Sequence, residues 1–149
     1  MSVGKVCNRE TVIARAEDTI VEVSKLMRLH HVGDVVVIEP DEGANVPIGI
    51  LTDRDLVMEI LAQDLSPDTV TVGDIMSEEI VTAREEDGIW DTLQRMRIKG
   101  VRRVPVVDAR GGLVGILALD DLLELLAGEL ADLSKIVRRE EGRERTSRE

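Results

Sequence analysis

The sequence predicts a mixed α/β (α+β) protein in which two like subdomains pack against each other. Three observations indicate this fold class: the chain repeats itself, each copy shows the same order of elements, and 43% of the 149 residues are hydrophobic. That share suffices for a real core in one compact domain. A copy of about 60 residues would be marginal alone, so we expect each copy to cover the apolar side of the other.

The internal repeat has an offset of 69 residues, as between Asp18 and Asp87. Three extra residues in the region 41–46 shift the offset to 66, so that residues 49–51 align with residues 115–117. A repeat of this length indicates two subdomains that face each other, and a site between them therefore exists in two versions.

Each copy is expected to form a strand, a helix, two strands and a second helix. Acidic residues mark the helix starts, and apolar residues near helical spacing follow them. The β-branched runs 34–39 and 103–108 are typical of strands buried on both faces, and turns rich in Gly, Asp and Pro follow at 40–47 and 109–112. The remaining expected elements are strands at 12–15, 81–84, 48–51 and 113–117 and helices from Ile20, from Ile89, from 53 to about 63 and from about 119 to 130.

The copies divide the chain into a first motif with its N-terminal lead-in at 1–66, a second motif at 67–132, and a charged C-terminal tail at 133–149. The final segment RREEGRERTSRE has no apolar residue, so it cannot join a core. We expect it to be frayed or disordered.

Composition excludes several classes of partner. Phe and Tyr are absent and Trp90 is the only aromatic residue, which argues against a reader of single-stranded nucleic acid. The net charge of −11 would repel any polyanion, so we expect no nucleic-acid partner. No apolar run approaches the roughly 20 residues of a membrane span. Cys7 is the only cysteine and no leader opens the chain, which indicates the cytoplasm.

Several segments occur in both copies in an order that resembles a known family, the tandem CBS domain pair or Bateman module, as a stand-alone protein of prokaryotic type. They are the lead-in VGDIM at 72–76, the acidic helix starts, VRRVPVVD at 101–108 and GILTDRDL at 49–56. The resemblance covers residues 3 to about 130. It implies two motifs packed through their sheets about a pseudo-twofold axis, two clefts that bind adenine nucleotides or S-adenosylmethionine, no catalysis, and a homodimer.

The resemblance also places residues in a first cleft. A ribose diol suits the carboxylate of Asp55, and phosphate oxygens suit a threonine hydroxyl and the planar guanidinium groups of an arginine pair. The candidate ligand-binding residues are Thr52, Asp55, Arg102, Arg103, Ser77, Ile80, Thr82 and Val101.

The second cleft is expected to be the weaker site. Ala118 lacks the hydroxyl that Thr52 supplies, and Asp34 stands where the first cleft has Arg103. Because a carboxylate repels phosphate, this cleft would suit a neutral or cationic ligand such as a nucleoside or S-adenosylmethionine. Its candidate residues are Asp121, Val32, Gly33 and Ile13.

Each assignment has a structural alternative. Thr52 could be a helix N-cap, Asp55 could cap its helix or pair with Arg54, and the arginine pair could be solvated or lie in a dimer contact. Adjacent residues on a helix point apart, so His30 and His31 do not indicate a metal site. The acidic pairs are better explained as helix starts, and no nucleophile accompanies them.

The leading hypothesis is a non-catalytic regulatory protein that senses AMP, ADP or ATP between its motifs, with no required cofactor and an unidentified protein target. One alternative is an interaction scaffold without nucleotide. Others are a binder of S-adenosylmethionine or another adenosine derivative and, least favoured, an enzyme.

Overall fold

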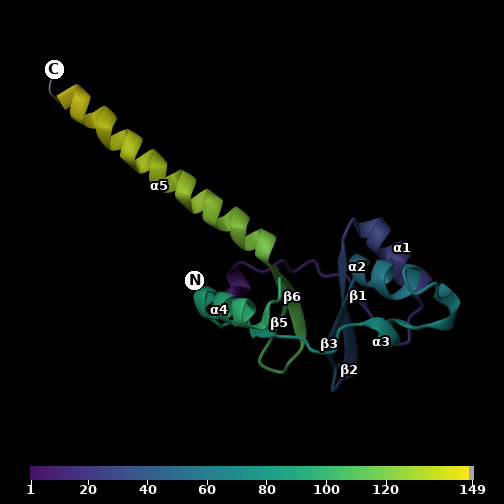
Figure 1. Cartoon of the computed structure of the whole chain (residues 1–149). Coiled ribbons are helices and arrows are strands. Elements are labelled where there is room, and N and C mark those ends of the chain that lie inside the picture. The colour runs from purple at the N-terminus through teal and green to yellow at the C-terminus, as the bar shows by residue number, and fades with distance from the viewer. Residues whose placement is uncertain (148–149) are drawn as a thin grey trace.

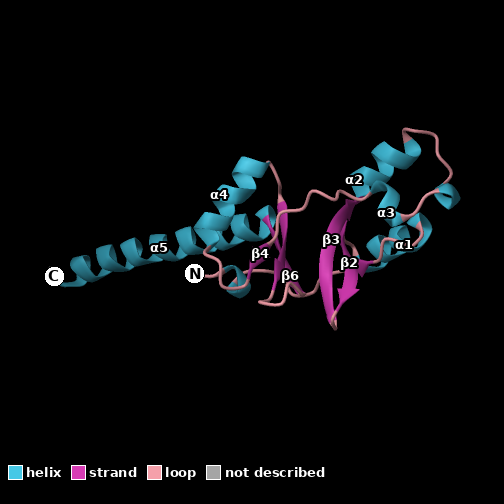
Figure 2. Cartoon of the chain, turned by 90° about the horizontal axis from the view of Figure 1, so that it is seen from below, coloured by secondary structure: helices cyan, strands magenta, loops and turns pink. Residues whose placement is uncertain are grey.

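The computed structural model describes residues 1–147 and confirms the predicted mixed α/β fold. Two three-stranded sheets stand side by side, each with helices on its outer side, and a long C-terminal helix leaves the second (Figures 1 and 2). The first copy contains β1 (Ile13–Ala14), α1 (Ile20–His30), β2 (Asp34–Asp41), β3 (Ala44–Thr52), α2 (Asp53–Asp55) and η2 (Leu56–Leu61), and the second contains β4 (Ala83–Arg84), α4 (Ile89–Lys99), β5 (Arg103–Val107), β6 (Leu113–Ala118) and α5 (Leu119–Ser147). The lead-ins hold η1 (Val3–Lys5) and, after the short η3 (Pro67–Thr69), α3 (Val72–Ile75).

The two sheets have the same topology and equivalent registers. In each sheet the middle strand pairs in parallel with the short first strand and antiparallel with the third. Asp34 lies opposite Thr52 in the first sheet, and Arg103 lies opposite Ala118 in the second. These pairs matter for the site because each links the start of a middle strand to the start of a second helix.

The first hairpin is longer than expected, because most of the segment 40–47 is strand rather than turn. β2 runs to Asp41 and β3 begins at Ala44. Between them, Glu42 and Gly43 have φ angles of 45° and 83°. A two-residue loop with positive φ at both positions matches the twist of its strands, so the inserted residues extend the hairpin.

The two lead-ins are exchanged between the copies. The N–H groups of Val3 and Gly4 donate to the carbonyls of Asp87 and Glu85, at 2.8 and 2.9 Å. The equivalent N–H groups of the second lead-in, on residues 72 and 73, donate to the carbonyls of residues 18 and 16 at 3.0 and 2.8 Å. The N-terminal lead-in, which we assigned to the first motif by sequence, therefore packs on the second.

Each copy has its own aliphatic core, and a third cluster joins the two sheets. Val3 belongs to the core of the second copy and Val72 to that of the first, as the lead-in exchange requires. The joining cluster consists of Val36, Ile38 and Ile116, all buried. The apolar faces of the two sheets thus cover each other, as the size of one copy led us to expect.

The two second helices differ. In the first copy α2 continues into a wider turn, η2, in which the Ala62 N–H donates to the Val57 carbonyl five residues back. In the second copy α5 continues to Ser147, so our expectation of a disordered tail is wrong for residues 138–147. The arginines and glutamates there are good helix formers and extend α5 without joining a core. Within residues 1–147 no helix is both long and apolar enough to cross a membrane.

Candidate functional site

The centre of the candidate site is an ion pair between the two copies. Arg103 Nε lies 2.9 Å from Asp34 Oδ1. These residues begin β5 and β2 and are equivalent in the repeat. Equivalent residues can touch only when both lie beside the pseudo-twofold axis, so this axis passes close to the pair. We expected the two side chains in separate clefts, and the structure instead joins them.

The ion pair lies among further acidic groups. Burial raises the pKa of Asp34, Arg103 opposes this rise, and the nearby carboxylates of Asp53 and Asp121 add to it. Asp53 begins α2 and Asp121 lies in the first turn of α5. The starts of both second helices therefore surround the axis, and Arg103 is a cation among three carboxylates.

The start of α2 forms a capping box. The Asp55 N–H donates to Thr52 Oγ1 at 3.1 Å, and the Thr52 N–H donates to Asp55 Oδ2 at 2.8 Å. The N-cap interpretation of Thr52 is therefore confirmed. The second copy keeps half of this arrangement, because the Ala118 N–H donates to Asp121 Oδ2 at 3.3 Å but alanine has no hydroxyl.

The arginine pair is divided between two environments. Arg103 reaches Asp34, the strand partner of Thr52, and so approaches the start of α2. Arg102 is exposed and pairs with Asp120 at 3.6 Å, beside its own helix α5. The structure thus brings Arg103 near the start of α2, where the first cleft is predicted, and keeps Arg102 beside α5 of its own copy.

The other predicted residues of the first cleft follow the second lead-in. Ser77 exchanges backbone hydrogen bonds of 2.9 and 3.1 Å with Ile50, two residues before Thr52. Ile80 and Thr82 continue this segment and are partly buried. Val101 packs against the core of the second copy. Ser77 is therefore held near the start of α2, and Val101 serves the core.

Part of the second predicted cleft lines a cavity of about 670 Å³. Ile13 and Val32 line it together with residues 8–12, Leu26 and His30. Asp121 lines an adjacent cavity of about 350 Å³, and Asn8 lines both. The Gly33 carbonyl accepts from the Asp53 N–H at 2.9 Å, which ties the loop to α2.

Thr11 belongs to the segment 8–13 that the sequence predicted to back the second cleft, although no role was assigned to this residue itself. It lines the larger cavity, and its buried Oγ1 has no hydrogen-bond partner among the described residues. Ile80 occupies the equivalent position of the second copy. Comparison of the copies at this position could have found it.

The two histidines have separate surroundings. His30 is the last residue of α1 and lines the larger cavity, and His31 follows the helix with a φ angle of 52°. Over residues 1–147 no group of three or more His, Cys, Asp or Glu side chains could hold a metal ion.

Comparison with known proteins agrees with this architecture. The sequence profile of the CBS domain matches residues 3–62 and 72–128. An uncharacterized protein of Methanopyrus kandleri is 40% identical over 126 residues, which cover 84% of this chain and 62% of that protein. A CBS domain-containing protein of Bacillus subtilis is 39% identical over 104 residues, 70% of each chain. The chain spans 62% of the length of the Methanopyrus protein and of a mitochondrial CBS domain-containing protein of Arabidopsis thaliana.

Solved structures share the fold. The CBS domain pair of protein MJ0100, in complex with 5′-methylthioadenosine and S-adenosylmethionine, is 26% identical, with a TM-score of 0.73 over 87% of this chain and 98% of that one. The cytosolic domain of the Mg²⁺ channel MgtE, in complex with ATP, is 27% identical, with a TM-score of 0.69 over 83% of this chain and 48% of that one.

Proposed function

Because the chain belongs to the CBS domain family, with two such domains in tandem, we propose that it is a non-catalytic regulatory protein that binds an adenosine-containing ligand between them. Adenine nucleotides (AMP, ADP or ATP) are the first choice. One observation carries this choice: Arg103 of the second motif reaches Asp34, the strand partner of Thr52 in the first. A guanidinium group from one motif thus stands beside the helix start of the other, where a phosphate group would meet both.

The capping box leaves the required groups available. Thr52 Oγ1 accepts one hydrogen bond, so its own proton can be donated to a phosphate oxygen. Asp55 uses Oδ2 for the Thr52 N–H, and its other oxygen can accept from a ribose hydroxyl. A phosphate that binds Arg103 would compete with Asp34 for the guanidinium. Binding would therefore act on the contact between the motifs, and a ligand changes a conformational equilibrium through such differential contacts.

The second cleft is proposed to take a neutral or cationic adenosine derivative. Ile13 and Val32 give the cavity aliphatic walls. Thr11 Oγ1, which has no hydrogen-bond partner among the described residues, could bond to a ligand there. Asp121, in the adjacent cavity, adds negative charge that disfavours phosphate. The complex of a related pair with 5′-methylthioadenosine and S-adenosylmethionine supports this ligand class.

Titration calorimetry on protein stripped of bound nucleotide tests the proposal with AMP, ADP, ATP and S-adenosylmethionine. We expect saturable nucleotide binding near one site per chain, which Asp55→Asn and Arg103→Met each weaken at least about tenfold. Arg84→Ala, which removes an exposed arginine of the same motif, is the control. Absence of binding by every adenosine compound would refute the sensor and leave the scaffold. Turnover of nucleotide that Asp55→Asn abolishes would instead support an enzyme.

We also propose a cytoplasmic homodimer that acts on a protein target. Val21 and Leu29 of α1 are exposed, and so are their repeat equivalents on α4, Trp90 and Ile98. Such paired apolar positions at both ends of the molecule support contacts between copies through the motif helices.

A further inference from the structure

Helix α5 extends well beyond the body of the protein. Leu122 is its only buried residue among those described, and Leu125 and Leu126 line a groove of about 260 Å³ beside Trp90. From residue 127 to residue 147 the helix is exposed and points straight away from both sheets (Figure 1). The side-chain hydrogen bonds recorded in this arm, residues 127–147, all lie within the helix.

The start of the arm continues an apolar seam along α5. Aliphatic residues recur at spacings of three and four residues, at Leu123, Leu126, Leu130, Leu133 and Val137. Leu130 and Leu133 expose 67% and 60% of their surface. A repeat of 3.5 residues per turn forms a narrow seam that another helix of the same repeat covers. In proteins most of the stability of a helix comes from packing of its apolar face, and such a partner would supply this packing for the exposed arm.

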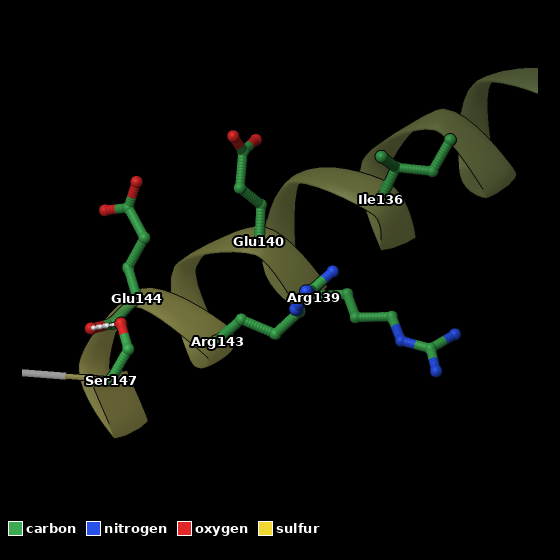
Figure 3. A pocket seen from close by; sticks show the side chains of 6 residues that line it. All are labelled: Ile136, Arg139, Glu140, Arg143, Glu144 and Ser147. Carbon is green, nitrogen blue, oxygen red and sulfur yellow. Dashed lines mark hydrogen bonds between the residues drawn. The ribbon is translucent and has the colours of Figure 1, made fainter.

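We propose that α5 of a second copy of this chain covers the seam, with the two helices antiparallel. The residues beyond Val137 decide the direction. Glu140 and Glu144 occupy the next seam positions, three and seven residues after Val137. Their side chains extend to one side of the helix, whereas those of Arg139 and Arg143 extend in other directions (Figure 3). In a parallel pair each glutamate would face the same glutamate of the second molecule, and two like charges side by side are unfavourable.

One antiparallel register satisfies the charges and the length of the arm. When Ile136 faces Ile136 of the second copy, Glu129 faces Arg143 of the second copy at both ends. Ser147 of the second copy then lies beside residues 123–125, so the arms overlap along their exposed length. A shift of one heptad towards the bodies would instead bring Ser147 beside residues 116–118, which belong to β6.

The covered surface is large enough for a specific contact. The five aliphatic side chains of the seam and that of Ile136 would be covered in each copy, at roughly 100 Å² each. The total, on the order of 1,000 Å², reaches the range of specific interfaces. The contact lies outside both clefts, and protein stripped of nucleotide can therefore test it independently of ligand binding.

Light scattering and sedimentation of the full chain test the contact. We expect Leu133→Asp to halve the number of chains per particle. Leu61→Asp is the matched control, because Leu61 is 72% exposed but lies in η2, away from the seam and from the exposed positions of α1 and α4. Circular dichroism of both variants verifies that the body remains folded. An unchanged number of chains in Leu133→Asp would overturn the proposal.

A charge exchange tests the direction. Glu129→Arg and Arg143→Glu should each raise the dissociation constant of the contact, by about tenfold at low salt, because each places like charges opposite one another. The double variant should restore it, since the opposite charges meet again with signs reversed. Single variants without effect, or a double variant that remains weak, would overturn the antiparallel register.

Discussion

Arg103 and Asp34 occupy the same position in the two copies, and an ion pair of 2.9 Å joins them across the pseudo-twofold axis. The backbone positions of the two residues are thus related by the pseudo-twofold axis, whereas their side chains carry opposite charges. This pair links the two motifs and stands beside the start of α2, so it couples the geometry of the pair to the proposed ligand site.

The ion pair is expected to stabilise the fold modestly. Arg103→Met leaves the Asp34 carboxylate partly buried without its cation and should lower the free energy of unfolding by about 1 kcal/mol, since the pair keeps some contact with water. Urea denaturation measures this. Adding Asp34→Leu should recover most of the loss, and a double variant less stable than the single would contradict this explanation.

Asp34 should also make stability depend on pH. Its pKa is raised by burial, against the effect of Arg103, so the folded state holds a proton that the unfolded state has released. Stability therefore falls as the pH rises from the ordinary aspartate pKa through the raised value. Asparagine does not titrate, so the free energy of unfolding of Asp34→Asn, measured in urea and compared with that of wild type, should rise over the same pH range. A constant difference would contradict the assignment.

His31 is expected to be a strained helix end. It has a φ angle of 52° after α1, where the equivalent residue after α4 is Gly100, with a φ angle of 65°. Glycine adopts this conformation without the steric cost, so His31→Gly should raise the free energy of unfolding by about 1 kcal/mol. Gly100→Ala should lower it by a similar amount. Thermal or urea denaturation checks both variants. A change in the free energy of unfolding of the same sign in both would be inconsistent with this cause.

Gly115 is expected to be essential for the contact of the first lead-in with β6. A Cβ there would lie 2.7 Å from the Asn8 carbonyl oxygen, whereas at the equivalent Gly49 it would first meet the Met76 sulfur, at 2.6 Å. A flexible side chain can move, but the Asn8 carbonyl is held by a hydrogen bond from the Ile116 N–H of β6. Gly115→Ala should therefore cost about 1–3 kcal/mol and Gly49→Ala less. Gly128→Ala, with nothing within 4 Å, is the control and should stabilise α5.

The capping box predicts opposite effects in the two copies. Thr52→Ala removes the hydroxyl that accepts from the Asp55 N–H and should cost about 1 kcal/mol. Ala118→Thr should supply the missing hydroxyl at the start of α5 and raise stability. Urea denaturation of both variants measures the difference, and a destabilised Ala118→Thr would show that the two helix starts are not equivalent.

Much of the fold could be predicted because local patterns and the repeat carry it. The order of elements, the buried strands and the acidic helix starts all follow from spacing and composition. The structure of the segment 40–47 could not be predicted in this way, because the positive φ values of Glu42 and Gly43 form a tight hairpin from a segment that reads as a turn. The helix over residues 138–147 was missed because a segment without apolar residues suggests disorder, although its residues favour helix.

The candidate site was only partly accessible from the sequence. Comparison of the copies selected Thr52, Asp55, Arg103 and Asp34, but it assigned Asp34 and Arg103 to opposite clefts. Thr11 was predicted only as part of the segment 8–13 behind the second cleft, although the repeat places Ile80 at its equivalent position.

The sequence alone determined that two equivalent motifs exist and how their residues differ, because hydrophobic spacing and repetition are properties of the chain. Only the tertiary structure decided which of these residues meet. The exchange of lead-ins and the contact of Arg103 with Asp34 depend on where the pseudo-twofold axis passes, and the packing of the two sheets sets that position.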